Sequence, residues 1–458
     1  TIRKGLNLPI EGSISSSDYT TEKDPEFVAL LPQESWGIKP QMLVKIDEEV
    51  KIGTPLFRDK RDPKVVFTAP AAGIIHAINR GERRAVQSVV IKVKNFEDSI
   101  KLDNDYKCRE SLKEILATSG LWPNLRQRPF DTVANSNDLP NAIFVTATNT
   151  HPLAADPYHL VKDRNSDIKA GLKAMCELSN GKVYFSMSSK KQWENYLIPE
   201  VEDHTFNGPH PAGNVGVHIN ALHPVNMERR VWHIDVQNLA DIGLFLTSGA
   251  LPTERIVAIV GPAAIEQKLI RTRHGASIEA FKNYAETNSR FISGSVLSGA
   301  TANPGEPLGY LSRYSQQISI VNDSLEREFM GWMKPVGSRW SFSGAYLAKF
   351  FKKSFKVDTD TNGSERAIVP SGAYEKVMPC DIMATQLIKA LVSDDIDNCQ
   401  YVSNNDQSDY DSDGDGDACD SDDDGDGILT INELDKNNDT IIDDTDNDGI
   451  PDYLDPNN

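Results

Sequence analysis

Between residues 27 and 93, short apolar runs alternate with glycine, proline and charged residues. Each run has four to eight residues and is rich in β-branched or large apolar side chains, which is typical of strands. The runs are 27–31, 42–46, 65–68, 73–78 and 86–93. This pattern predicts a small β-domain over residues 1–100.

The pattern changes after residue 100. Leu112, Ile115 and Leu116 follow a helical spacing that ends at Gly120, and a second amphipathic stretch covers 166–178. Continuous apolar runs at 142–147 and 182–186 are typical of buried strands. Alternating helices and strands predict an α/β domain over 101–254 with a partly parallel sheet.

A third pattern occupies residues 255–302. An apolar run at 255–260, an amphipathic stretch near Ile278 and a run at 293–299 predict a small ubiquitin-like β-grasp unit, which resembles domains of the SLBB type. Further short strands, such as 317–321, lead us to expect a β-rich segment over 303–393. The fold class predicted for residues 1–393 is therefore a multidomain mixture of α/β and α+β units.

Residues 394–458 differ sharply in composition. They contain 22 Asp, one Glu, one Lys and no Arg, whereas the whole chain carries a net charge of −19. The preceding body is therefore nearly neutral, and the acidic segment needs cations to fold in water.

Several functional classes lack their motifs in this sequence. There is no G-x-G-x-x-G loop after a strand, no P-loop and no C-x-x-C pair. We therefore expect no tightly bound flavin, nicotinamide or iron–sulfur cluster. Cys108, Cys176 and Cys380 are scattered, as expected for reduced thiols. No apolar run has the length of a signal peptide or a membrane-spanning helix, so we expect a soluble chain.

Three features of the body are candidate sites. The loop 208–216 is either an anion-binding or partner-binding loop, or a tight connection that needs glycine and proline. Five histidines lie within 30 residues, but their spacing does not place two on one helical face: His204, His210, His218, His223 and His233. The basic stretches 80–84 and 126–129 are too short to predict a nucleic-acid interface. Spacing alone assigns no catalytic residue, and the cofactor-binding residues stay unknown.

Two phrases of the first domain resemble the halves of a biotinyl/lipoyl-type barrel-sandwich. They are 44–56 and 69–78. Carrier domains of that fold present a lysine for cofactor attachment, whereas this chain has Ala69-Pro70-Ala71-Ala72. The resemblance therefore implies the fold without the carrier function.

An ordered set of motifs resembles one family along residues 2–393. The motifs are 1–10, 79–84, 119–122, 126–130, 208–216, 293–299, 361–366 and 374–379. Together they are similar to the A subunit of the sodium-translocating NADH:quinone reductase. In that family a further helical segment follows the stretch that corresponds to Pro379–Ile382, and here the acidic segment begins instead.

The resemblance implies a specific role. It implies a peripheral protein of a membrane complex, on the cytoplasmic face of the bacterial inner membrane, which takes part in the quinone-reduction half of sodium-coupled electron transfer. Ubiquinone would be the substrate of the complex. Membrane subunits of the same complex would be the partners, chiefly the flavin-bearing B subunit, and no nucleic acid is implied.

The acidic segment has the spacing of calcium loops. Asp422, Asp424, Asp426 and Glu433 occupy positions 1, 3, 5 and 12 of a 12-residue loop, with Gly427 at position 6. The same pattern recurs twice downstream. Candidate calcium ligands there are Asp435, Asn437, Asp439, Asp444, Asp446, Asp448 and Asp455.

Residues 397–420 resemble a thrombospondin type 3 repeat. The resemblance implies calcium binding by Asp409, Asp411 and Asp413. It also implies a disulfide between Cys399 and Cys419.

The two parts indicate different compartments. A component of the reductase would lie in the reducing cytoplasm, whereas a disulfide-closed calcium module suits an oxidising extracellular space. We interpret the acidic segment as foreign to the body, joined to it near Ser393. The alternative is an exported calcium-binding surface or adhesion protein that carries the body as a passenger.

Overall fold

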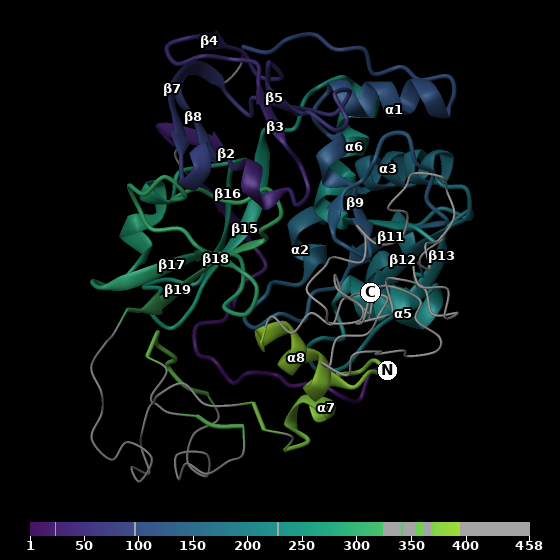
Figure 1. Ribbon diagram of the computed structural model, residues 1–458, viewed down its shortest axis with the longest axis vertical. Helices are drawn as coiled ribbons and strands as arrows, with labels where there is room; N and C mark the ends of the chain where they lie inside the picture. Colours follow the sequence, from purple (N-terminus) through teal and green to yellow (C-terminus); the bar gives the residue numbers. More distant parts are fainter. Residues whose placement is uncertain are drawn as a thin grey trace, which may run out of the picture. The chain divides into compact units, whose positions relative to one another are not determined.

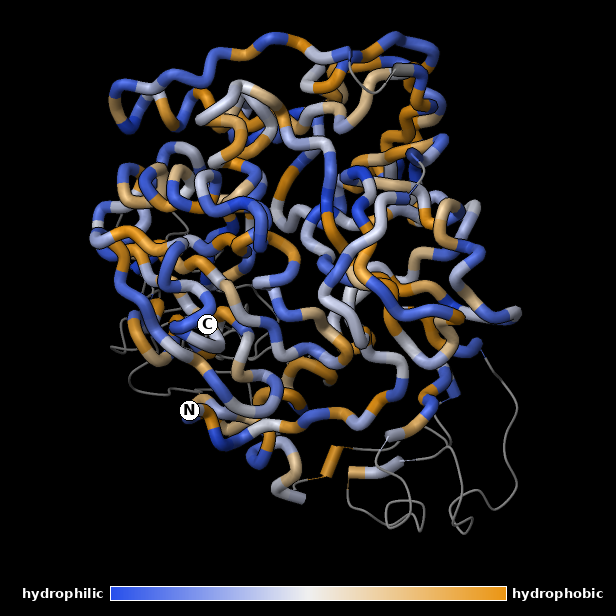
Figure 2. The backbone as a smooth tube through the Cα atoms, turned by 180° about the vertical axis from the view of Figure 1, so that it is seen from behind, coloured by the Kyte–Doolittle hydropathy of each residue, from blue (hydrophilic) through white to orange (hydrophobic). Residues whose placement is uncertain are grey.

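The computed structural model describes residues 1–22, 24–95, 98–226, 229–323, 340–342, 354–360, 368–369 and 371–393. The chain divides into two compact units. The first comprises Thr1–Glu365 with Lys376–Cys380, and the second comprises Arg366–Glu375 with Asp381–Asn458. Figure 2 shows short hydrophobic segments alternating with hydrophilic ones along the chain, as a fold with several layered cores requires.

The first domain of this unit is a sandwich of two small sheets. One has the order β2-β8-β7-β4 and the other β3-β5-β6. Their strands are β2 (Phe27–Leu30), β8 (Val86–Asn95), β7 (Ala72–Arg80), β4 (Glu49–Val50), β3 (Pro40–Met42), β5 (Pro55–Asp59) and β6 (Val66–Thr68). Apolar side chains such as Leu56, Phe57 and Ile75 are fully buried between the sheets. The short 3-10 helix η1 (Pro32–Glu34) follows β2 in the chain.

The second domain is a six-stranded sheet in the order β10-β9-β14-β11-β12-β13. Strands β14, β11, β12 and β13 are parallel, and β9 joins β14 in antiparallel orientation. The bounds are β9 (Arg126–Arg128), β10 (Thr132–Val133), β11 (Ala142–Ala147), β12 (Lys182–Met187), β13 (Glu202–Thr205) and β14 (Val231–Asp235). The partly parallel sheet expected from the sequence is therefore present.

Helices cover both faces of this sheet. Ile143 and Val145 of β11 belong to the large core, whereas Ala142 and Phe144 pack in a separate cluster with α5 residues Val215 and Ile219. Helices α3 and α6 lie side by side (Figure 1). The helices are α1 (Arg109–Thr118), α2 (Pro157–Val161), α3 (Asn165–Leu178), α4 (Lys190–Trp193), α5 (Val215–Leu222) and α6 (Val236–Ser248), with 3-10 turns η3 (Trp122–Asn124) and η4 (Glu194–Tyr196).

The third domain has the strand order of a β-grasp unit, extended by one strand. Its sheet runs β1-β16-β15-β19-β17-β18, with β15 and β19 parallel at the centre. The bounds are β1 (Tyr19–Thr21), β15 (Glu254–Val260), β16 (Lys268–Arg273), β17 (Ser289–Ser293), β18 (Ala300–Thr301) and β19 (Gln317–Asn322). The expected helix near Ile278 is the 3-10 helix η5 (Ile278–Tyr284). Because β19 is central, the sheet continues beyond the boundary expected at residue 302.

Residues 1–12 cross the surface of the first compact unit in an extended conformation. The Ile2 N–H donates to the Asn207 carbonyl at 2.7 Å, and the Leu6 N–H donates to the His210 carbonyl at 2.7 Å. A Cβ atom on Gly12 would lie 2.2 Å from the Gly261 carbonyl oxygen, so only glycine allows this approach. This segment, which we call the strap, therefore connects the second and third domains.

Two strand predictions are wrong at their ends. The run 42–46 contributes only Met42 to β3, because the chain turns at Asp47, where φ is 68°. The run 293–299 contributes only Ser293 to β17, because Gly294 has a φ of 108° and the following residues form a turn. In both cases a turn interrupts an apolar run that the sequence pattern read as continuous.

The segment 303–393 was expected to be rich in strands. Its described residues contain one strand, β19, and two helices, α7 (Ala373–Val377) and α8 (Ala384–Ser393). The apolar residues of α8 recur at helical spacing, as an amphipathic helix requires.

The close packing of α3 and α6 predicts that Gly243 cannot be enlarged. A Cβ atom there would lie 1.8 Å from the Asp167 carbonyl oxygen, so Gly243→Ala should lower the free energy of unfolding by about 1–3 kcal/mol. Gly216 of α5 is the control, because a Cβ atom there meets nothing within 4 Å. Gly216→Ala should leave stability unchanged or raise it by up to about 1 kcal/mol. Urea unfolding of both variants measures this, and equal effects would contradict the packing argument.

Candidate functional site

A cleft of about 1080 Å³ lies where the three domains of the first unit meet. The second domain contributes the carboxyl ends of β11 and β14 and the start of α5, which is the edge where open α/β sheets bind ligands. The other walls come from residues 31–38 and 40 of the sandwich and from the β-grasp domain, around Ser293–Ala302 and Leu308–Gln317. We call this space the cleft.

One corner of the cleft holds a compact group of charged side chains. Asp131 lies 2.8 Å from Arg126, 3.3 Å from Arg128 and 2.7 Å from Nε2 of His233. Burial opposes the charge of Asp131, but the His233 hydrogen bond and the two arginines outweigh it and lower the pKa of the carboxyl. Burial lowers the pKa of His233 to about 4. At neutral pH this corner therefore holds two guanidinium groups and one carboxylate.

The aromatic ring of Tyr314 completes this corner. The Arg126 guanidinium lies 4.5 Å from the ring centroid, which is a cation–π contact. The Tyr314 hydroxyl donates to the Pro123 carbonyl at 2.8 Å. Tyr314 thus links the β-grasp domain to the second domain at the wall of the cleft.

Another wall of the cleft carries His151, in the loop that follows β11. Its ring lies 4.5 Å from the ring of His210, and its Nδ1 lies 3.2 Å from Oγ of Ser295. Burial and the neighbouring His210 lower the pKa of His151 to about 4. An uncharged imidazole therefore lines the cleft at neutral pH.

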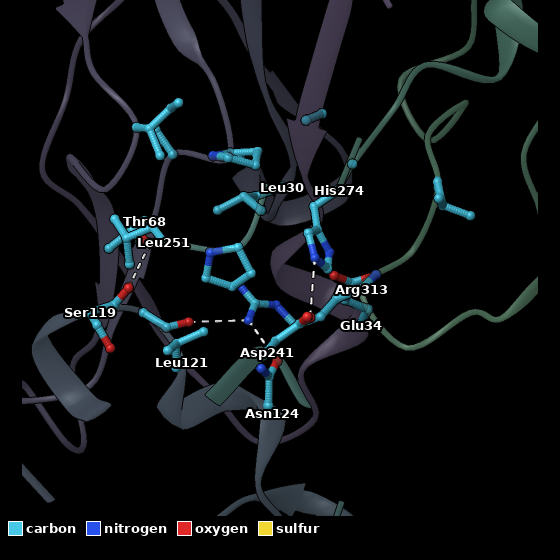
Figure 3. Close-up of a pocket in the computed structure, with 18 residues that line it drawn as sticks. Leu30, Glu34, Thr68, Ser119, Leu121, Asn124, Asp241, Leu251, His274 and Arg313 are labelled. Atoms are coloured by element: carbon cyan, nitrogen blue, oxygen red, sulfur yellow. Dashed lines mark hydrogen bonds and ion pairs between the residues drawn. The ribbon is translucent and has the colours of Figure 1, made fainter. Parts of the chain in front are cut away.

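A small pocket of about 50 Å³ lies deeper between the same domains (Figure 3). Arg313 occupies its centre and donates from Nη1 to the Gly120 carbonyl at 3.2 Å and to Oδ1 of Asn124 at 2.9 Å. The Arg313 N–H donates to Oε2 of Glu34 at 3.0 Å. Glu34 also lines the cleft, and burial raises the pKa of its carboxyl against the opposing influence of Ser312 and Arg313.

Asp241 of α6 forms a buried ionic pair at the other side of this pocket. It lies 2.6 Å from Arg164 and 3.4 Å from Nε2 of His274, an interaction that Figure 3 shows as a dashed line. Burial opposes ionisation of Asp241, but the hydrogen bond from His274 and the charge of Arg164 lower the pKa of the carboxyl. Burial lowers the pKa of His274. A carboxylate beside a neutral imidazole therefore joins α6 to the segment after β16.

The five histidines noted in the sequence lie in separate surroundings. His233 lines the cleft, His210 lies beside His151, and the ring of His218 lies 4.1 Å from the ring of Phe206. His204 and His223 both face the ring of Tyr184, at 5.7 and 6.5 Å. Within the described ranges, no three His, Cys, Asp or Glu side chains are placed to hold a metal ion.

The other candidate segments are also placed by the structure. Gly213, Asn214 and Val215 line the cleft, and the Gly213 N–H donates to Oγ1 of Thr150 at 2.8 Å. Gly208 has a φ of 147°, as a tight connection requires. The loop 208–216 therefore has features of both interpretations: a loop that binds an anion or a partner, and a tight connection. The basic turn 80–84 precedes Ala85 and Val86, which line the cleft.

The body cysteines Cys108, Cys176 and Cys380 are free thiols. Burial raises the pKa of Cys176 to about 11. All proposed calcium ligands, together with Cys399 and Cys419, lie outside the described residues.

Sequence reasoning missed the residues that shape the cleft. Glu34, His151 and Arg313 are isolated polar residues that belong to no motif, and Ser295 lies in the motif 293–299, which pointed to the family and not to a site. One signal was available, because Asn149 and His151 follow a buried strand whose carboxyl end belongs to a parallel sheet.

Three family models match successive parts of the chain. The NqrA N-terminal barrel-sandwich hybrid domain matches residues 1–94, and the NqrA second alpha/beta domain matches 107–251. The model described as the NQRA C-terminal domain matches 256–303.

Curated relatives match nearly the whole body. The A subunit of the Na(+)-translocating NADH-quinone reductase of Yersinia pseudotuberculosis serotype O:1b (strain IP 31758) is 42% identical over 409 residues, which cover 87% of this chain and 90% of the relative. The corresponding A subunit of Pasteurella multocida (strain Pm70) is 41% identical over 411 residues, covering 87% and 91%. The chain belongs to the family of the A subunit of the Na(+)-translocating NADH-quinone reductase. This confirms the family expected from the motifs, and it supports the reductase interpretation rather than an exported adhesion protein.

Two further findings concern this member of the NqrA family. An NAD⁺-reducing [NiFe]-hydrogenase structure shares 10% identity at a TM-score of 0.32, over 40% of this chain and 41% of its own, which is too weak to support an inference. Among the described residues, no helix is both long and apolar enough to cross a membrane.

The buried histidines predict that stability falls in mild acid. His151, His218 and His233 have pKa values lowered to about 4, whereas an unfolded histidine titrates near 6.5. Below pH 6.5 the unfolded chain therefore binds more protons than the folded chain. Their contribution to stability is complete above pH 6.5 and is lost as pH falls toward 4. Thermal unfolding between pH 7.5 and 4.5 measures this loss.

His218→Gln tests the assignment of this effect. His218 Nε2 lies 2.9 Å from the Ala212 carbonyl, and no described residue hydrogen-bonds its buried Nδ1, so protonation would bury an unpaired charge. The variant removes one of the three groups and should lose less stability over the same interval. An unfolding temperature that does not change from pH 7.5 to 4.5 in the parent chain would contradict the argument.

Proposed function

We propose that this chain is the peripheral A subunit of a sodium-pumping NADH:ubiquinone oxidoreductase and takes part in the reduction of ubiquinone. We place it at the cytoplasmic face of the bacterial inner membrane. The family assignment supports the role in the complex, and the cleft supports a direct part in quinone binding.

The observation that carries the proposal is the size and chemistry of the cleft. Its volume of about 1080 Å³ exceeds what a small aromatic head group needs. Its walls offer the aromatic ring of Tyr314 and the hydrogen-bond donors of Arg126, Arg128 and His151. A quinone head group is a flat ring with two carbonyl oxygens, so it needs stacking surfaces and donors of this kind.

Two exposed aromatic side chains, one in the cleft wall and one next to the strand that carries Arg126 and Arg128, suit contact with another component of the complex. Trp36 lines the cleft and is 73% exposed, and Phe130 follows two residues after Arg128 and is 72% exposed. Large exposed aromatic residues are typical anchors of protein interfaces. We propose that they contact the membrane part of the complex, chiefly the flavin-bearing B subunit, so that the cleft faces the redox centres of the partner.

A substitution that fills the cleft should block ubiquinone binding. Ala300 lines the cleft and is exposed, so Ala300→Trp adds bulk without disturbing the core. We expect the affinity for ubiquinone-1, measured by equilibrium dialysis with the purified full chain, to fall at least about tenfold. In the complete complex the same variant should raise the KM for quinone.

Ala280→Trp is the matched control, because Ala280 is exposed in η5 and lines none of the pockets described. Its affinity should stay within about twofold of the parent chain. Equal affinities of the parent chain and Ala300→Trp would contradict the proposal, as would a parent chain that binds no ubiquinone.

We propose that the acidic segment 394–458 binds calcium. The support is its spacing: Asp422, Asp424, Asp426 and Glu433 match a loop in which position 12 supplies two oxygens. The further ligands proposed are Asp409, Asp411, Asp413, Asp435, Asn437, Asp439, Asp444, Asp446, Asp448 and Asp455. Dissociation constants of roughly 10⁻⁴–10⁻³ M are typical of extracellular modules of this kind.

Glu433→Gln should weaken one calcium site by removing a bidentate ligand. Isothermal titration of the full chain with calcium chloride measures affinity and the number of ions bound. Asp395→Asn is the control, because it removes the same charge outside the proposed loops. Identical curves for the two variants would show that general charge, rather than loop geometry, binds calcium. The unfolding temperature of the body should be the same in both.

A further inference from the structure

His151 is held in a fixed position at the wall of the cleft. Its backbone N–H donates to Oδ1 of Asn149 at 3.0 Å, and Nδ2 of Asn149 donates to Oε1 of Gln316 at 3.3 Å. One residue further, the Pro152 carbonyl accepts from Nε2 of Gln317 at 3.2 Å. The loop after β11 is therefore fastened to the β-grasp domain on both sides of His151.

The contact with Ser295 determines which ring nitrogen carries the proton. Oγ of Ser295 accepts the N–H groups of Leu297 at 3.2 Å and Ser298 at 3.3 Å, which occupies both of its lone pairs. Its hydroxyl proton must then be donated, either to Nδ1 of His151 or to Oγ of Ser298, each at 3.2 Å. The unprotonated imidazole nitrogen is the better acceptor. Ser295 therefore fixes the tautomer of His151 with the proton on Nε2.

The resulting Nε2–H group is available to a ligand. No protein atom among the described residues hydrogen-bonds it, and the side chain lines the cleft. The ring is uncharged at neutral pH, since its pKa is about 4. A neutral imidazole with this tautomer is a directional donor, and its other nitrogen is already engaged.

We propose that the Nε2–H of His151 donates a hydrogen bond to a carbonyl oxygen of the quinone, and that Ser295 is the positioning residue that holds this tautomer. The inference rests on the proposed function of the cleft. It adds a specificity: a quinone carbonyl oxygen accepts this hydrogen bond more strongly than a quinol hydroxyl oxygen does, and the quinol hydroxyl also needs an acceptor for its own proton, which this nitrogen cannot provide. His151 thus favours the oxidised ligand over the reduced product.

The test compares affinities for ubiquinone-1 and ubiquinol-1, measured anaerobically with the purified full chain. His151→Phe keeps a ring of similar size without a donor. It should weaken ubiquinone-1 binding about fivefold to tenfold, as expected for one hydrogen bond, and change ubiquinol-1 binding less than about twofold. His76→Phe is the matched control, because His76 is exposed on β7 and lines none of the pockets described, and it should change neither affinity.

Ser295→Ala tests the positioning role, with Ser298→Ala as its control. Of these two serines, Ser295 is the one that contacts His151, so Ser295→Ala should remove most of the preference for quinone, and Ser298→Ala should keep it. The ring ¹⁵N shifts of His151 report the tautomer directly. They should show a bare Nδ1 in the parent chain and in Ser298→Ala, and a mixture of tautomers in Ser295→Ala.

The outcomes separate this inference from the proposed function. If Ala300→Trp blocks ubiquinone binding but His151→Phe retains the parent affinities, the cleft binds quinone and the role of His151 is wrong. If the parent chain binds no ubiquinone, the proposed function is wrong, and the proposed hydrogen bond from His151 to the quinone is wrong with it. Urea unfolding midpoints of all variants identify any that fail to fold. In that case the ¹⁵N shifts of the parent chain still decide the tautomer, and a protonated Nδ1 there would overturn the inference.

Discussion

The arrangement of the three domains depends on one half-buried charge, Arg313, and on its neighbour Tyr314. The Arg313 guanidinium donates to Gly120 and Asn124 of the second domain. The backbone N–H of Arg313 donates to Glu34 of the sandwich. Tyr314 repeats the connection through the Pro123 carbonyl. A guanidinium cannot lose its charge and is costly to bury without partners, so its partners must stay in register. Arg313 and Tyr314 thereby hold the three domains of the first unit together.

The cleft follows from this constraint because no single domain contains it. Its parallel-sheet edge belongs to the second domain, Glu34 belongs to the sandwich, and Ser295 belongs to the β-grasp unit. A displacement of any one domain would separate groups that now lie within hydrogen-bond distance. Precision at the site therefore comes from the contacts between domains, and Glu34 lines both the cleft and the small pocket.

The sequence predicted the layers better than the site. The apolar runs 73–78, 86–93 and 142–147 are long and regular, so the strands at 72–80, 86–95 and 142–147 were found with nearly correct limits. Short runs failed where a turn with positive φ cut them, as at Asp47 and Gly294. The site as a whole could not be predicted because its residues lie far apart in the chain, and several of them, such as His151 and Ser295, lie in irregular segments without periodicity. His151 and Ser295 are 144 positions apart, and only the folded sheets bring them together.

The strap has a consequence for the way the chain is made. Its partners at residues 207–210 and 261 lie far along the sequence, and the Asn7–His210 hydrogen bond spans 203 positions. During synthesis these first residues leave the ribosome long before anything exists for them to bind. They can reach these partners only after the second and third domains have formed. The segment translated early is thus among the last to reach its final position, and it closes over domains that are already assembled.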